Sequence, residues 1–346
     1  MNIPIQNIYY LLIYAWDKAE LRNLINFKKE ENTTLIDLFV ILLLNEVDRE
    51  VKRGLVRNYL TTEEERTFVK GKLNINESIK KRTFSKMSAI CATDDLSYNI
   101  TINQILYNTL NKLIKVNELK KSMKYKIKNT LKHFPDVSTI TINERLFNAI
   151  VWNRQNNRYK FAIHLCHLID QNILPSQNEG TLKFKDFLGN ERQMAKIFES
   201  FIKNFYKKEQ KRYTKVGSRK IKWQLQGDDK SMEYLPEMLT DITLENKEER
   251  IIIDAKYYKN TLAERYDAKQ IHSTNLYQIF SYLLNQRDDD VKHTNDTKGI
   301  LIYPVVKDEL DLSYIFQNHS IEIKTLNLNQ NWQDIERRLF DIIGVN

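Results

Sequence analysis

Cysteine, glycine and proline are all scarce in this chain of 346 residues. The two cysteines, Cys91 and Cys166, stand far apart and form no CxxC pair. This spacing excludes a thiolate zinc cluster and a disulfide framework, and it predicts a reducing compartment, the cytoplasm. Eight glycines and five prolines argue against a low-complexity chain and against a large, loop-rich β-sandwich.

Long hydrophobic runs are absent as well. The longest, Ile8–Trp16 and Leu38–Leu44, fall far below the ~20 residues that span a bilayer, so no membrane contact is expected. The N-terminus has neither a basic segment nor a small-residue cleavage site, so it is not read as a signal peptide. No GxxxxGK[ST] segment occurs, which predicts that this chain binds no nucleoside triphosphate by itself.

Positive charge is abundant, with a formal net charge of +9. Such an excess favours a polyanionic partner, although a lysine-rich composition alone can produce it. The densest basic run covers residues 203–222, with nine Lys or Arg against one acid and with Tyr206, Tyr213 and Trp223 nearby. Part of this run must lie in a buried strand, so only part of it can face a nucleic acid.

The clearest loop signal is the segment ILPSQNEGT at 173–181, where proline, glycine and small polar residues cluster. It predicts a boundary between domains 1–178 and 179–346. Hydrophobic periodicity predicts a mostly helical first domain with a small extended insertion at 66–103. Its expected helices are Asn7–Lys18, Leu35–Val51, Asn103–Val116, Lys121–Phe134, Ile142–Trp152 and Tyr159–Ile173.

The second domain is expected to be α/β, with a mixed central sheet flanked by helices. Its expected helices are Glu191–Glu209, Ala263–Asn285 and Trp332–Ile343, and its expected strands are Lys220–Gln226, Met238–Glu245, Arg250–Tyr257, Gly299–Val306 and Ile321–Leu326.

The segment LTDITLENKEERIIIDAK carries the most specific chemistry. Side chains alternate along a strand, so Asp254 and Lys256 project from the same face. Asp241 begins the preceding strand of a predicted hairpin, whose pairing can bring it beside Asp254. Two carboxylates suit a hard cation such as Mg²⁺ or Mn²⁺, and Lys256 can orient the attacking water or stabilise the transition state. The triplet alone is equally compatible with a strand that ends in solvent.

Two further places could support such a site. Gln278 and Tyr282 share one face of the expected helix and could bind a DNA phosphate or steady Lys256. Glu199, on the helix at 191–209, could add a metal contact, although a solvated carboxylate is the ordinary alternative.

These residues resemble the McrC family, the nuclease subunits of McrBC modification-dependent restriction systems, over nearly the whole chain. The resemblance rests on IPIQNIYYLLIYAW at the N-terminus and on TDI, IIIDAKYYK, HSTNLYQIFSYL and LIYPVV in the second half. The TD…DAK core is shared with the broader PD-(D/E)xK nuclease superfamily. No proline abuts Asp241 here, because Met238-Leu239-Thr240 precedes it and Pro236 lies further upstream.

The resemblance implies a restriction-endonuclease-like second domain in which Asp241, Asp254 and Lys256 are catalytic and the two aspartates bind Mg²⁺ or Mn²⁺. It also implies a partner, an McrB-like AAA+ GTPase hexamer that recognises double-stranded DNA carrying modified cytosine. The first domain would insert into that ring and stimulate its GTPase, and the second would cut DNA. A non-catalytic adaptor, a GTPase activator and DNA clamp that keeps the nuclease fold, is the alternative.

Overall fold

The chain forms two compact units, which differ from the predicted division at residues 1–33 and 179–185. The computed structural model describes residues 3–25, 33–176, 180–258, 263–265, 268–286, 297–305 and 309–345. The helical unit comprises Thr34–Lys185, and the sheet unit comprises Met1–Thr33 together with Asp186–Asn346. The first 33 residues, predicted to belong with the helical domain, therefore fold with the sheet.

Contacts with distant residues explain why the N-terminal segment joins the sheet unit. Helix α1, Ile5–Ala15, packs along α8, Glu191–Glu209. The Asn204 amide donates to the main-chain oxygens of Tyr14 and Ala15, both at 3.0 Å, and the Tyr14 hydroxyl donates to Glu209 at 2.6 Å. Tyr14 also stacks on Trp332, with ring centroids 5.6 Å apart. Local periodicity predicts the helix but not this long-range partner.

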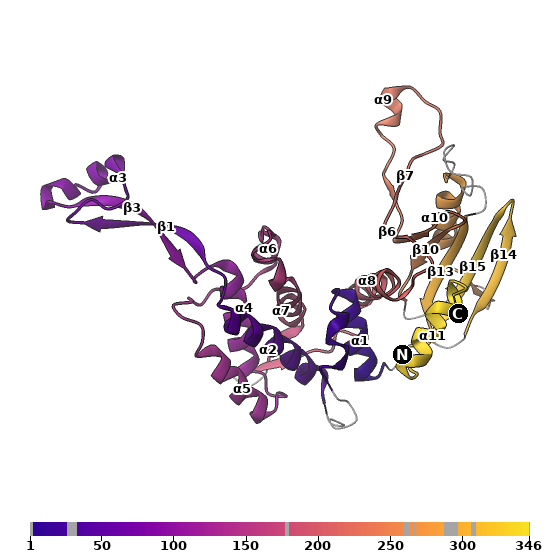
Figure 1. Cartoon of the computed structure of the whole chain (residues 1–346), viewed down its shortest axis with the longest axis horizontal. Coiled ribbons are helices and arrows are strands. Elements are labelled where there is room, and N and C mark those ends of the chain that lie inside the picture. The colour runs from indigo at the N-terminus through magenta and orange to yellow at the C-terminus, as the bar shows by residue number, and fades with distance from the viewer. Residues whose placement is uncertain are drawn as a thin grey trace. The chain divides into compact units, whose positions relative to one another are not determined.

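Helices and a hairpin form the helical unit. The longest helix, α2, begins at a capping box between Thr34 and Asp37 and ends at Gly54, whose φ of 86° suits glycine. Its helices are α2 Leu35–Arg53, α3 Ile75–Lys80, α4 Thr101–Ile114, α5 Lys121–Leu131, α6 Glu144–Asn148 and α7 Lys160–Asn172. Its strands are β1 Asn58–Arg66, β2 Lys72–Leu73, β3 Ala89–Ser97, β4 Ile173–Pro175 and β5 Leu182–Phe184. Figure 1 shows β1 and β3 extending away from α2, α4 and α7, with α3 at the far end.

A six-stranded mixed sheet is the centre of the sheet unit, in the order β14-β15-β13-β10-β9-β6. Strand β13 is parallel to β10 and β15, and the other pairings are antiparallel. The sheet's strands are β6 Lys215–Gly217, β9 Ile242–Glu245, β10 Arg250–Ala255, β13 Lys298–Pro304, β14 Asp311–Phe316 and β15 His319–Leu326. This confirms the predicted mixed sheet flanked by helices, although β6 and β14 were not predicted.

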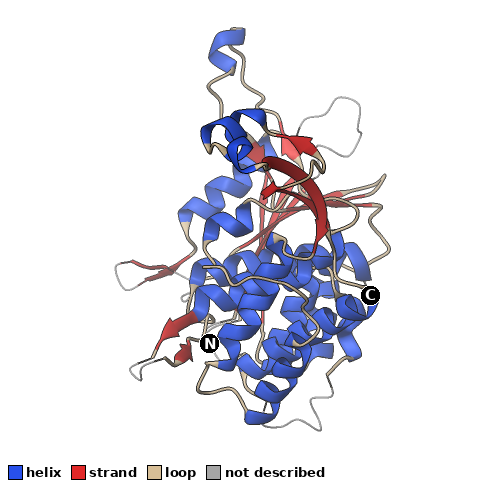
Figure 2. Ribbon diagram, turned by 90° about the vertical axis from the view of Figure 1, so that its left-hand side faces the viewer, coloured by secondary structure: helices blue, strands red, loops and turns tan. Residues whose placement is uncertain are grey.

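Helices cover the sheet, and a two-stranded arm leaves it. Helix α10, Ser273–Leu284, packs on the sheet face that carries Ile252 and Leu301. Helix α8 packs against β10 on the opposite face, toward which the alternate residues of that strand point. Helix α11, Trp332–Ile342, contacts β15. Strands β7 Lys220–Ile221 and β8 Met238–Leu239 form the base of the arm, and α9, Asp229–Met232, lies at its far end (Figures 1 and 2).

Three expected elements need correction. The helix expected at Ala263–Asn285 begins only at Ser273, and short strands β11 Ala263–Arg265 and β12 Ala268–Gln270 precede it, because the apolar stripe starts only at Leu276. The helix expected at Ile142–Trp152 is reduced to α6, which Asn143 caps and which ends after one turn. The strand expected at Lys220–Gln226 is paired only over β7.

Candidate functional site

The hairpin of β9 and β10 brings the two predicted aspartates together. Ile242 pairs with Ile253, so Asp241, one residue before β9, lies beside Asp254. The Ala255 main-chain N–H donates to Oδ2 of Asp241 at 3.2 Å and holds that carboxyl against β10. Every residue of β10 is buried, so the strand is anchored on both faces and delivers Asp254 from a rigid base.

Asp254 is fully buried and lies close to Lys256. The Nζ atom of Lys256 is 2.7 Å from Oδ1 of Asp254, and the lysine side chain is 20% exposed. Apart from this contact with Lys256, neither carboxylate oxygen of Asp254 has a hydrogen-bond partner among the described residues. Buried carboxylate oxygens without such partners are rare in proteins, and they fit a group that binds a cation. The donor set, two carboxylates, is the kind that Mg²⁺ and Mn²⁺ prefer.

The electrostatics agree with two acids crowded into one site. The pKa of Asp241 is raised to about 8, mainly by burial and further by the negative charge of Asp254 beside it. Burial lowers the pKa of Lys256, but the charge and hydrogen bond of Asp254 outweigh it, so this pKa is raised. Lys256 therefore stays protonated, and it balances the charge of only one carboxylate when both are ionised.

Glu199 lies near this pair, on α8. Burial raises the pKa of its carboxyl, and the negative charge of Asp241 raises it further. Lys203, one turn along α8, is 3.6 Å away and offsets part of that charge. Among the residues that the structure describes, no three His, Cys, Asp or Glu side chains are grouped closely enough to form a metal site. The core of the site is therefore the pair Asp241 and Asp254 with Lys256.

Helix α10 places Gln278 and Tyr282 above the same face of the sheet. The Gln278 amide donates to the Tyr282 hydroxyl at 2.8 Å, and that hydroxyl donates to the main-chain oxygen of Leu239 at 2.8 Å. Burial raises the pKa of Tyr282, and the charges of Asp254 and Asp241 add to it. Tyr282 thus joins α10 to the strand that leads into Asp241, rather than contacting Lys256.

One polar chain beside the aspartates was not predicted. The Tyr258 hydroxyl donates to Oδ1 of Asn275 at 3.2 Å, and the Asn275 amide donates to the Tyr303 hydroxyl at 2.9 Å. Burial raises the pKa of Tyr303, with Asp254 contributing. The sequence feature that could have revealed this chain is the position of Asn275, which shares a helix face with Gln278 and Tyr282.

The basic run at 203–222 is only partly exposed. Tyr206 and Tyr213 are buried in the core, and Arg212 pairs with Glu249 at 2.6 Å. Trp223 donates its ring N–H to the main-chain oxygen of Pro236 at 2.7 Å, within the arm. The expectation that only part of this run faces outward is confirmed.

Comparison with known proteins identifies the family. The model of the family described as "McrBC 5-methylcytosine restriction system component" matches residues 7–304. The chain belongs to this family. The matched range contains Asp241, Asp254 and Lys256, and the predicted resemblance to McrC is confirmed.

One curated relative supports the McrBC assignment, and one solved structure shares the fold. The chain is 30% identical over 341 residues to the type IV methyl-directed restriction enzyme EcoKMcrBC of Escherichia coli strain K12, covering 98% of this chain and 97% of the relative. The fold of this chain is also similar to that of a chain in the half-complex from the tetradecameric assembly of Thermococcus gammatolerans McrB AAA+ hexamers with bound McrC. That match has a TM-score of 0.51 and 16% identity, and it covers 99% of this chain and 75% of the other.

The McrBC-family chain has no bilayer-spanning helix among its described residues, because none is both long and apolar enough.

Proposed function

We propose that this chain is the DNA-cleaving subunit of a modification-dependent restriction complex and that it hydrolyses phosphodiesters with Mg²⁺ or Mn²⁺. The observation that carries the proposal is the convergence of Asp241, Asp254 and Lys256 at the end of β10. Membership of the McrBC family supports a restriction role. The mixed sheet with α8 and α10 on its two faces is compatible with a PD-(D/E)xK nuclease domain.

Each residue has a distinct part in the proposed reaction. Asp241 and Asp254 would hold the metal ion. Glu199 lies near enough for the charge of Asp241 to raise its pKa, and its carboxylate would support the ion. A bound divalent ion supplies an activated water and neutralises charge on the phosphate. Lys256, kept protonated by Asp254, would donate to a phosphate oxygen or to the attacking water and stabilise the added negative charge. Tyr282 and Gln278 would hold the strand before Asp241 in place.

The proposed partner follows from the relatives. The Thermococcus assembly contains McrB AAA+ hexamers with bound McrC, and the Escherichia coli relative is a methyl-directed restriction enzyme. We therefore assign this chain an McrB-like GTPase ring as partner and double-stranded DNA with modified cytosine as substrate. The helical unit, Thr34–Lys185, would dock on the ring and stimulate its GTPase. Both cysteines are free thiols, which suits the cytoplasm.

The decisive variant is Asp254→Asn, which keeps the side-chain volume and removes the charge. With the partner, GTP, Mg²⁺ and methylated DNA present, cleavage should fall by about 10²-fold or more because transition-state stabilisation is lost. Stimulation of the partner GTPase should be unchanged. The matched control is Asp341→Asn, the same chemical change at an exposed position on α11, which should cleave normally.

The same assay separates nuclease from adaptor. Normal GTPase stimulation by the wild-type chain without cleavage in either Mg²⁺ or Mn²⁺ would favour the non-catalytic adaptor. Undiminished cleavage by Asp254→Asn would contradict the assigned site.

A further inference from the structure

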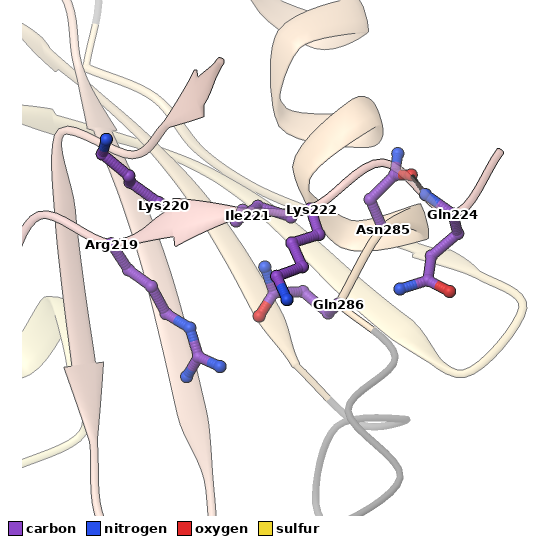
Figure 3. A pocket seen from close by; sticks show the side chains of 7 residues that line it. All are labelled: Arg219, Lys220, Ile221, Lys222, Gln224, Asn285 and Gln286. Carbon is purple, nitrogen blue, oxygen red and sulfur yellow. Dashed lines mark hydrogen bonds between the residues drawn. The ribbon is translucent and has the colours of Figure 1, made fainter. Parts of the chain in front are cut away.

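A small cationic pocket lies beside β7, outside the aspartate site. Its volume is about 230 Å³. Its polar lining consists of three cations and three amides: Arg219, Lys220, Lys222, Gln224, Asn285 and Gln286. Figure 3 shows Lys222 reaching toward Gln286 on the same side of the strand as Arg219, while Lys220 extends the other way.

Hydrogen bonds from two directions hold the pocket walls. On one side, the Thr240 main-chain N–H donates to the Arg219 oxygen at 3.0 Å, and the Arg219 N–H donates to the Thr240 hydroxyl at 2.9 Å. On the other, the Gln224 N–H donates to Oδ1 of Asn285 at 2.7 Å. The pocket is thus built between the strand that leads into Asp241 and the C-terminal end of α10.

A buried cation lies directly behind the lining. Arg250 is almost completely buried, and its Nη1 donates to Oε1 of Gln286 at 2.7 Å, while its Nη2 has no hydrogen-bond partner among the residues that the structure describes. One carboxylate, Glu245, serves three cations: Arg250 at 2.8 Å, Arg219 at 2.7 Å and Lys215 at 3.3 Å. Glu245 carries one negative charge beside these three positive ones, and three of the described lining side chains are cations, so the wall of the pocket is cationic.

Lys222 adds a further charge at the pocket mouth. Within the described part of the chain it has no acidic partner, whereas Lys220 pairs with Glu237 at 2.6 Å. Lys222 is therefore the lining cation with the most freedom to bind an incoming anion.

The size and chemistry of the pocket point to a phosphate group. Its volume lies below the ~300–1,000 Å³ typical of sites for drug-sized ligands, and none of the described residues that line it has an aromatic ring on which a base could stack. Cationic and amide donors around a small cavity suit a phosphate oxyanion.

We propose that this pocket binds a backbone phosphate of the DNA strand near the scissile bond. The proposal deepens the nuclease function and rests on it. Ile221, in the pocket wall, pairs with Met238, three residues before Asp241. At a rise of ~3.3 Å per residue, the pocket lies roughly 10 Å along the chain from the aspartate pair, within reach of the same DNA strand.

The test measures DNA binding rather than cleavage. The full-length chain, without divalent ions, is titrated with a short duplex at several salt concentrations. Lys222→Gln should weaken binding several-fold and reduce the slope of log K against log[salt] by about 0.9, as expected for one lost phosphate contact. Lys222→Arg should retain both the affinity for DNA and the slope. The matched control is Lys128→Gln, an exposed lysine in the helical unit, which should leave the slope unchanged.

A second arm uses inorganic phosphate as the probe. At matched ionic strength, phosphate should raise the Tm of the wild type and Lys128→Gln above that seen in chloride, but not the Tm of Lys222→Gln. If phosphate shows this pattern while DNA binding is unaffected, the pocket is a free-anion site and the DNA proposal is overturned. If Lys222→Gln changes neither measurement, the pocket binds no phosphate. Because binding is measured without metal, a failure of Asp254→Asn to stop cleavage would overturn the nuclease assignment and leave this result standing.

Discussion

At the scale of single residues, the two neighbouring aspartates destabilise the fold when both are ionised. Asp241 and Asp254 lie side by side with one lysine to share, and burial raises the pKa of Asp241 to about 8. Functional sites commonly hold such unfavourable charge arrangements, so removing one of the charges should stabilise the fold while destroying activity.

Asp241→Asn should therefore raise the stability of the metal-free protein at pH 7. The folded carboxyl is protonated up to about pH 8, whereas the unfolded carboxyl ionises near pH 4, so ionisation favours the unfolded chain at every pH above that value. The expected gain is about 1–3 kcal/mol after allowing for solvent screening, or several degrees in Tm. Thermal unfolding from pH 4 to pH 8 measures it.

The sign of the pH dependence makes this prediction specific. The difference between Asp241→Asn and the wild type should shrink as the pH falls toward 4, because the unfolded carboxyl is then protonated too. The variant should also lose the Tm increase caused by Mg²⁺. The control is Asp228→Asn, at an exposed carboxylate whose pKa is lowered by hydrogen bonds from Ser231, and it should not raise the Tm. A wild-type Tm equal to or above that of Asp241→Asn at pH 7 would contradict the argument.

Sequence patterns predicted that Asp241, Asp254 and Lys256 lie together, because that placement depends on strand alternation and on hairpin pairing. They did not identify the buried Arg250 or the Tyr258–Asn275–Tyr303 chain. Arg250 begins a strand in a charged stretch and looks solvated in the sequence. Only the packing of Glu245 and Gln286 around it shows that it is buried.

At the scale of elements, the close approach of α10 to the sheet depends on Gly299. A Cβ at this position would lie 2.8 Å from Cγ1 of Ile279 and 3.0 Å from Cδ1 of Leu283. Both are side chains of α10, the helix whose Tyr282 binds the main chain before Asp241. Because Gly299 has no side chain, α10 can lie close enough to β13 to support the site.

Gly299→Ala should displace α10 and cost about 1–3 kcal/mol of unfolding free energy, because an extra methyl group is forced into a packed core. Cleavage should fall as well, since the contact between Tyr282 and Leu239 is disturbed. Denaturant unfolding and the cleavage assay measure the two effects. Gly217→Ala is the control, because a Cβ there meets no atom within 4 Å, and its effect should stay within about 0.5 kcal/mol. Equal effects from the two variants would show that α10 does not depend on Gly299.

Element boundaries were predicted with mixed success, for physical reasons. Helix α8 was predicted at Glu191–Glu209, because its apolar face is long and regular, and the structure shows that Asn190 caps it. Strand β14, at the sheet edge, was missed because its residues are largely exposed and carry no buried alternation. Edge strands owe their structure to pairing with a neighbour, and local sequence does not show that neighbour.

At the scale of the whole molecule, the sheet unit depends on a segment far away in the sequence. Asn7 donates from its side chain to the main-chain oxygens of Leu328 and Gln330, at 2.9 and 2.7 Å. Tyr10 stacks on Trp332 with ring centroids 4.3 Å apart. Helix α1 therefore closes the core of a unit whose remaining chain begins at Asp186.

A chain restricted to residues 186–346 should consequently fail to fold cooperatively, because α8 and Trp332 would expose their aromatic face. Joining residues 1–33 to 186–346 through a flexible linker should restore one sharp thermal transition. Near-ultraviolet circular dichroism and dye binding distinguish the two states. A fully cooperative fragment 186–346 with the same Tm as the joined chain would show that α1 is dispensable.

The sequence by itself determined the residue chemistry, the family and the type of most elements, because these depend on residue identity and on short periods along the chain. The tertiary structure decided which distant segments meet: α1 with α8, Gly299 with α10, and the basic segment at Arg219–Lys222 with the end of that helix. These choices depend on the shape and hydrogen bonding of surfaces that are not adjacent in the sequence, and no local pattern carries that information.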